Sequence, residues 1–232
     1  MSRRHVAAAA LLLAFINSFF YVAIVFTPVR AVSDSMMPTI LPGDWVLVRH
    51  TTLRHELTWL LKGTSMGDQV PFRVEPGDLV LYSSTSERSA SSQGAILKRV
   101  AGTPGDTLES RDSSIRINGH ALEWSDSVQQ PDFAFEWGPV RIPEVGDRFS
   151  PVSHSQTPLA TGFLERDGTL PTTVRVSTPL YFVIGDNPVY SIDSRDVGLI
   201  PENRIQGVAR RVLFSKDGDE IRWGRTMQGI GP

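Results

Sequence analysis

The sequence predicts a mainly β fold, in which an N-terminal transmembrane helix precedes a β-rich domain that carries an inserted smaller β subdomain. Three observations predict it. One long apolar segment lies near the N-terminus. Short runs rich in Val, Leu, Ile, Phe and Tyr follow, many of them next to turn signals such as Pro-Gly-Asp. A later stretch, residues 110–178, has many Pro, Ser, Asp and Gly residues and few long apolar runs.

The apolar segment runs from Val6 to Phe26. At about 1.5 Å per residue it spans roughly 30 Å, the thickness of one hydrocarbon core. A cleaved signal peptide is the alternative, but its apolar region is usually about 7–15 residues long. We therefore expect a retained anchor over residues 6–27. Arg3 and Arg4 favour a cytoplasmic amino terminus, so the remaining chain would lie outside the cytoplasm.

Six later segments have the composition of strands: residues 44–50, 77–84, 94–102, 113–123, 179–187 and 205–215. The fourth alternates around Asn118-Gly119, which favours a two-residue hairpin turn. Apart from the anchor, only residues 53–63 have helical character. The chain thus divides into a cytoplasmic end (1–5), an anchor (6–27), the first part of a core (28–109), an insertion (110–178) and the second part of the core (179–232).

Composition excludes several kinds of chemistry. The chain has no cysteine, which rules out disulfides, thiolate catalysis and Cys-ligated metals. The formal net charge of -2 gives no indication of a nucleic-acid partner. No metal-ligand spacing such as H-E-x-x-H occurs. A G-x-S-x-G pattern at Gly63–Gly67 lacks the strand-to-helix context that a hydrolase elbow needs. The extramembrane histidines have polar or turn-like surroundings typical of surface residues: His50, His55, His120 and His154.

The basic residues are mostly arginine, with lysine only at positions 62, 98 and 216. Lys98 lies in an apolar run, where burial would lower the pKa of its amine. A neutral amine can act as a general base toward a hydroxyl. The alternative is a lysine at a strand edge that extends to water. Lys62 and Lys216 lie next to glycine-containing, turn-like segments and are weaker candidates.

Four sequence blocks occur in order behind the apolar segment: SDSMMPTILPGDWVLV, GDLVLY, ILKRVAGTPGD and IGDNPVYSIDSRDVGLIP. Together they resemble bacterial type I signal peptidases, the Ser-Lys proteases that remove signal peptides from exported proteins. The resemblance implies that Ser35 is the nucleophile and Lys98 its general base. It also implies that the Ser33 hydroxyl and the Ser35 backbone N–H form the oxyanion hole. Asp34 departs from the family, in which glycine is frequent at this position.

The last block has further implied roles. Ser191 would orient the lysine amine, and Asp193 and Arg195 would support the site as an ion pair. The substrate would bind as an extended strand and be cut after a small-x-small motif, without metal or cofactor. Met36, Ile40 and Leu97 are the expected pocket walls.

The resemblance also implies the surroundings of the enzyme. We expect a single-pass protein of the bacterial inner membrane, with its catalytic domain on the periplasmic side, and with pre-proteins and the lipid bilayer as partners. A specialised pilin-processing peptidase of conjugation systems with the same dyad is an alternative function. A membrane-anchored β domain that only binds a partner is a further alternative, but it predicts a damaged dyad, whereas Ser35, Lys98 and Ser191 are all present.

Overall fold

The structure, a computed structural model, describes residues 25–50, 74–83, 95–123, 136–151 and 171–230. Within these ranges the fold is mainly β with antiparallel pairing, which confirms the predicted class. The largest sheet has the strand order β1-β2-β13-β3-β4-β11-β12, and β14 pairs with β13. Its strands are β1 (Phe26–Arg30), β2 (Asp44–His50), β3 (Leu79–Ser83), β4 (Ala95–Gly102), β11 (Leu180–Ile184), β12 (Ile200–Pro201), β13 (Ile205–Asp217) and β14 (Glu220–Ile221).

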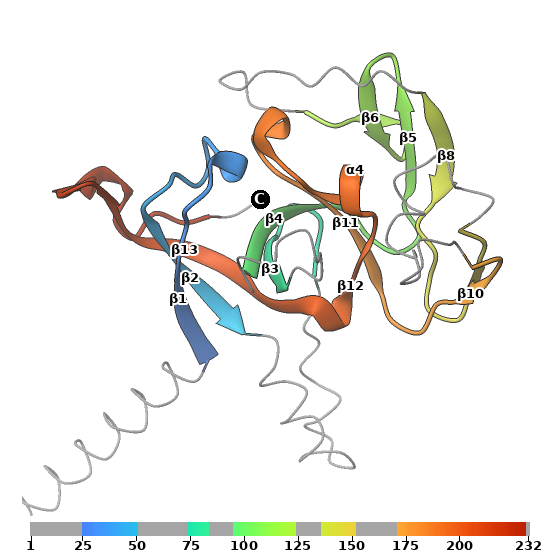
Figure 1. Cartoon of the computed structure of the whole chain (residues 1–232), viewed down its shortest axis with the longest axis horizontal. Helices are drawn as coiled ribbons and strands as arrows, with labels where there is room; N and C mark the ends of the chain where they lie inside the picture. The colour runs from blue at the N-terminus through green and yellow to red at the C-terminus, as the bar shows by residue number, and fades with distance from the viewer. Residues whose placement is uncertain (1–24, 51–73, 84–94, 124–135, 152–170, 231–232) are drawn as a thin grey trace, which may run out of the picture.

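A smaller sheet with the order β7-β6-β5-β8 lies at the end of the molecule beyond β11 (Figure 1). Its strands are β5 (Thr107–Arg111), β6 (Ser114–Ile117), β7 (His120–Ala121) and β8 (Trp137–Arg141), and β9 (Arg148–Phe149) pairs with β10 (Val174–Arg175). The predicted hairpin is confirmed, because Asn118 and Gly119 connect β6 to β7 with φ of 53° and 81°. Buried side chains of this sheet share one core cluster with Phe182 and Ile184 of β11.

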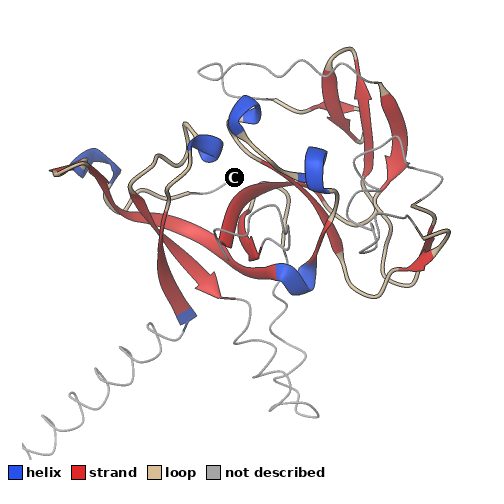
Figure 2. Ribbon diagram, in the orientation of Figure 1, coloured by secondary structure: helices blue, strands red, loops and turns tan. Residues whose placement is uncertain are grey.

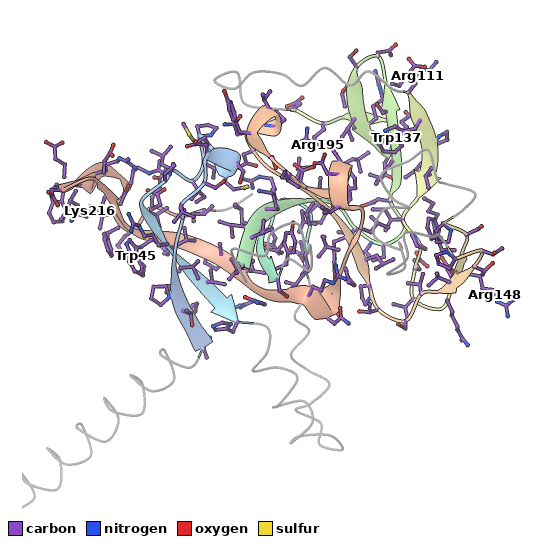
Figure 3. The ribbon with its side chains drawn as sticks, in the orientation of Figure 1. Trp45, Arg111, Trp137, Arg148, Arg195 and Lys216 are labelled. Atoms are coloured by element: carbon purple, nitrogen blue, oxygen red, sulfur yellow. The ribbon has the colours of Figure 1, made fainter. Side chains whose placement is uncertain are left out.

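The long strand β13 joins the two halves of the large sheet. It pairs with β2 on one side and with β3 on the other, so Val208 lies opposite both Arg49 and Val80. Several apolar side chains of these strands are fully buried, including Val48 and Val208. Near its far end, Trp45 of β2 stacks on Phe214 of β13 with ring centroids 5.6 Å apart, in the region labelled Trp45 in Figure 3. The strand-like runs at 44–50 and 205–215 therefore form adjacent strands.

Apart from Val25, helical structure in the described part of the chain is confined to short turns (Figure 2). These are η1 (Asp34–Met36), η4 (Pro188–Tyr190), α4 (Ser194–Val197), η5 (Glu202–Arg204) and η6 (Trp223–Arg225). The expected helix at 53–63 lies outside the described residues, as does the expected anchor up to residue 24. The last two residues assigned to that anchor, Phe26 and Thr27, belong to β1 instead.

Among the residues that the structure describes, we find no helix with the length and apolar character needed to cross a membrane.

Candidate active site

Ser35 and Lys98 are 63 positions apart in the sequence, and the fold brings their side chains together. Lys98 Nζ lies 2.6 Å from Ser35 Oγ, at hydrogen-bond distance. Lys98 is on β4, and Ser35 is in η1, within the connection between β1 and β2. Both residues are buried, with relative exposures of 2% and 7%. The arrangement is a hydroxyl and an amine in direct contact and largely shielded from water.

Burial changes the protonation chemistry of this amine. Because the surrounding protein removes water from the charged form, the pKa of Lys98 falls from 10.5 to about 8, although Asp193 and Asp186 act in the opposite direction. The apolar strand thus favours the neutral amine, as expected for a buried lysine, and the alternative of a lysine extending to water does not hold. At pH 7 about one Lys98 amine in ten is therefore neutral and can accept a proton.

Ser33 stands at the N-cap of η1, and its Oγ accepts a hydrogen bond from the Ser35 backbone N–H at 3.1 Å. The two groups expected to contact an oxyanion are therefore adjacent and paired with each other. Ser33 is exposed, so its hydroxyl can rotate toward an approaching carbonyl oxygen. Asp34 lies between them with an exposed side chain.

The expected support residues form one hydrogen-bonded cluster around Asp193, which is fully buried. The Ser191 hydroxyl donates to Asp193 Oδ2 at 2.7 Å, so in this structure its bond goes to the carboxylate and not to the lysine amine. Arg195, labelled in Figure 3, pairs with both carboxylate oxygens of Asp193 through Nε at 2.7 Å and Nη2 at 2.8 Å. Its Nη2 also donates to the Pro188 carbonyl, which ties α4 to η4.

Two residues absent from our sequence-based set contact the Ser35 turn directly. Gly185 lies so close that an added Cβ would collide with the Ser191 side chain and lie 2.5 Å from the Ser35 carbonyl oxygen. Asn187 donates its backbone N–H to that same carbonyl at 3.0 Å. Both belong to the sequence block IGDNPVYSIDSRDVGLIP. Strand patterning cannot identify them, because their role depends on a backbone approach between segments 150 residues apart in sequence.

Ion pairs fix the segments on either side of this turn. Arg99, next to Lys98, forms a bidentate pair with Asp186 at 2.7 Å for both bonds. On the other side, Arg225 of η6 binds the fully buried Asp44 and donates to the Thr39 carbonyl at 2.8 Å. Burial alone would raise the pKa of Asp44, but hydrogen bonds from Arg225, from the Ser215 hydroxyl and from the Leu41 backbone lower it below its ordinary value.

A cavity of about 380 Å³ opens beside the pair. Its lining includes Ser35 and Lys98 together with the three expected pocket residues, Met36, Ile40 and Leu97. Large exposed apolar side chains also line this cavity: Val32, Tyr190 and Ile192 have relative exposures of 80%, 70% and 70%. The arrangement can receive an apolar chain next to a hydroxyl and a neutral amine.

The other candidate residues lie elsewhere. His50 bonds to Thr27 Oγ1 at 2.6 Å, and His120 is exposed on β7. Lys216 pairs with Asp219 on the surface. His55, His154, Lys62 and the Gly63–Gly67 pattern lie outside the described residues.

The chain is similar in sequence to known proteins. A family profile described as "Signal peptidase, peptidase S26" matches residues 3–214. The curated relatives include Signal peptidase I of Bacillus amyloliquefaciens, 27% identical over 82% of this chain and 74% of its own, and Signal peptidase I T of Bacillus subtilis (strain 168), 26% identical with the same coverage. A crystal structure of a signal peptidase I from Enterococcus faecalis V583 covers 60% of this chain and 98% of its own at 23% identity, with a TM-score of 0.34, too low to add to the family match.

Proposed function

Because the chain belongs to the signal peptidase family, peptidase S26, we propose that Ser35 and Lys98 are the nucleophile and general base of its peptide-bond hydrolysis. Its activity is that of a signal peptidase I, a serine endopeptidase that removes signal peptides from pre-proteins. The observation that carries the assignment is the 2.6 Å contact between Lys98 Nζ and Ser35 Oγ in a buried setting.

The proposed reaction has two steps. Neutral Lys98 takes the proton of Ser35 as Oγ attacks the substrate carbonyl carbon, and the amide bond breaks as Lys98 returns that proton to the leaving amine. In the second step Lys98 takes a proton from water as the water oxygen attacks the acyl carbon. The ester bond to Ser35 then breaks as Lys98 returns that proton to Ser35 Oγ, and the acyl group leaves as a carboxylic acid. The Ser35 N–H and the Ser33 hydroxyl stabilise the oxyanion in each step, at about 3–4 kcal/mol per donor in comparable sites. Ser191, Asp193 and Arg195 would keep the lysine side of the site in place.

The proposed substrate segment is extended and ends in a small-x-small motif. An extended peptide lying along β4 beside Ser35 would direct alternate side chains into the cavity. Met36, Ile40 and Leu97 would limit the size of the side chains that fit at the first and third positions before the cut. This proposal needs no metal or cofactor.

The proposed topology places residues 6–25 across the bacterial inner membrane and residues 1–5 in the cytoplasm. Segments 26–109, which include β1, and 179–232 would form the catalytic core on the periplasmic side, and 110–178 the inserted subdomain. Two features support this topology: the family match begins at residue 3, and the candidate active site follows β1 directly. Contact with the lipid bilayer would bring the cavity close to a substrate held by its own apolar signal.

The direct test is incubation of the detergent-solubilised full chain with a pre-protein, with the cut mapped by mass spectrometry. The parent should cut after a small-x-small tripeptide, and Ser35→Ala should abolish the cut. Ser114→Ala, a matched change on β6 of the smaller sheet, should keep the parent rate. Equal cleavage by Ser35→Ala and the parent would refute the assignment of Ser35 as the nucleophile. Cleavage restricted to one pilin substrate would favour the specialised pilin-processing alternative.

A further inference from the structure

One residue, Asn187, binds two consecutive carbonyls of the turn that carries Ser35. Its backbone N–H donates to the Ser35 carbonyl at 3.0 Å, and its side-chain Nδ2 donates to the Asp34 carbonyl at 3.1 Å. Asn187 is almost completely buried, at 9% relative exposure. Two donors in a fixed relation thus fix the direction of two successive peptide groups.

The second of these bonds acts on the expected oxyanion donor. The Asp34 carbonyl and the Ser35 N–H belong to the same peptide group, which is planar. The Asp34 carbonyl accepts both Asn187 Nδ2 and the Met37 backbone N–H, the latter at 3.0 Å. Together these donors fix the carbonyl, and so fix the direction of the N–H on the opposite side of that plane. Donation to the carbonyl also polarises the peptide group, which strengthens the N–H as a hydrogen-bond donor.

The geometry of Asn187 departs from what its position in the chain would ordinarily produce. It stands at the N-cap of η4, where an asparagine side chain usually accepts a hydrogen bond from the helix. Its side chain makes no such capping bond and is directed to the Ser35 turn instead. The segment around it is anchored, because Asp186 pairs with Arg99 and Arg195 holds the Pro188 carbonyl.

We propose that Asn187 is a positioning residue that orients and polarises the 34–35 peptide group, so that the Ser35 N–H, which donates to Ser33 Oγ in this structure, is held in place for the developing oxyanion. This inference rests on the proposed function of Ser35. It assigns the Asn187 side chain to transition-state stabilisation and not to substrate binding. Loss of its Nδ2 donor should therefore lower kcat and leave KM largely unchanged.

Asn187→Asp is the sharpest variant, because it keeps the shape of the side chain and replaces the donating amide nitrogen with an oxygen. We expect kcat for pre-protein cleavage to fall about 10- to 100-fold, less than or equal to the loss for a missing oxyanion donor. KM should stay within about twofold of the parent. Asn187→Ala should likewise lower kcat and leave KM nearly unchanged, without adding a charge. Asn203→Asp, the same substitution at an exposed position in η5, is the matched control and should leave kcat unchanged.

A second readout separates orientation of the oxyanion donor from general damage. A peptide aldehyde ending in a small-x-small sequence forms a tetrahedral adduct with a serine hydroxyl, whereas an uncleavable peptide of the same sequence does not. We expect the aldehyde to lose affinity for Asn187→Asp by about the factor lost in kcat, and the uncleavable peptide to bind as it binds the parent. Ser33→Ala combined with Asn187→Asp should cost less than the product of the two single effects, because both act on one oxyanion.

Parent-like kcat in both Asn187 variants would overturn the proposal, and so would a rise in KM with kcat unchanged. Loss of the fold in both variants, measured by thermal unfolding, would also overturn it, because the residue would then be purely structural. Ser35→Ala in the same assay separates these outcomes from failure of the proposed function. If Ser35→Ala is inactive while Asn187→Asp is fully active, only the inference about Asn187 fails.

Discussion

Lys98 gives a prediction whose size follows from its surroundings. In Lys98→Met an uncharged side chain of similar length replaces a buried amine with a pKa of about 8 and an ordinary value of 10.5. Each tenfold difference in proton affinity between folded and unfolded states corresponds to about 1.4 kcal/mol. At pH 7 Lys98 is mostly charged in both the folded and the unfolded chain, and at high pH it is neutral in both. The parent should therefore be less stable at pH 7 than at high pH by roughly 3 kcal/mol.

The sign of the pH dependence follows from the lowered value. Between about pH 8 and 10.5 the unfolded chain binds the proton and the folded chain does not, so stability rises with pH across this window. The parent should gain about 2–3 kcal/mol relative to Lys98→Met between pH 7 and pH 10. Urea unfolding of both proteins at the two pH values measures this difference. A stability difference between parent and Lys98→Met that is the same at pH 7 and pH 10 would refute the lowered pKa of Lys98.

As the proposed general base, Lys98 should also set the pH dependence of cleavage. At pH 7 a pKa of about 8 leaves about one amine in ten neutral, against about one in 3,000 at the ordinary value. We expect kcat/KM of the parent to rise about tenfold from pH 6 to 7 and to level off above about pH 8. Lys98→Met should have no measurable cleavage at any pH. A cleavage rate that is flat between pH 6 and 8 would contradict the assignment of Lys98 as the base.

Three further substitutions test other parts of the site. Ser33→Ala should lower kcat about 100-fold with little change in KM, measured by steady-state cleavage, because one oxyanion donor is lost; an unchanged kcat would exclude Ser33 from the oxyanion hole. Gly185→Ala should abolish cleavage and lower the free energy of unfolding by about 1–3 kcal/mol. The reason is that its methyl group would displace Ser191 or the turn that carries Ser35. Parent-like cleavage and urea unfolding would contradict this expectation by showing that the turn tolerates the displacement. Arg225→Ala should destabilise the fold by about 3–5 kcal/mol at pH 7 by leaving Asp44 buried without its main partner. Since the pKa of Asp44 is lowered from 3.8, the stability that Arg225 contributes should be lost as the pH falls below about 4; an unfolding difference between parent and Arg225→Ala that is the same at pH 7 and pH 3 would contradict this pairing.

The strands were predictable because their signals are local. The runs at 44–50, 94–102 and 205–215 became β2, β4 and β13, since apolar patterning and Pro-Gly-Asp turns act within a few residues. Strand β1 was missed because Phe26–Arg30 continues an apolar segment that we assigned to the anchor. The first strand of the smaller sheet, β5, begins at Thr107, directly after the Pro-Gly-Asp turn at 103–106, and its buried side chains share a core with β11.

The site was predictable only where motifs carry chemistry. The proximity of Ser35 and Lys98 followed from the resemblance, since sequence spacing alone does not show that residues 63 positions apart meet. The roles of Gly185, Asn187 and Arg225 depend on contacts between backbone segments far apart in the chain, and no local pattern reports them. The bond from Ser191 to Asp193 likewise depends on geometry within the folded loop.

The pairing of β2 with β13 has a consequence for synthesis on the ribosome. The segment with Ser35 lies between β1 and β2, but β2 gains its second neighbour only when residues 207–215 have emerged. Arg225, which binds Thr39 and Asp44, emerges later still. A nascent chain therefore contains the serine and the lysine long before they can be held in contact. Contacts between segments so far apart in the sequence form slowly. A growing polypeptide would therefore have no protease activity until its final strands have been translated.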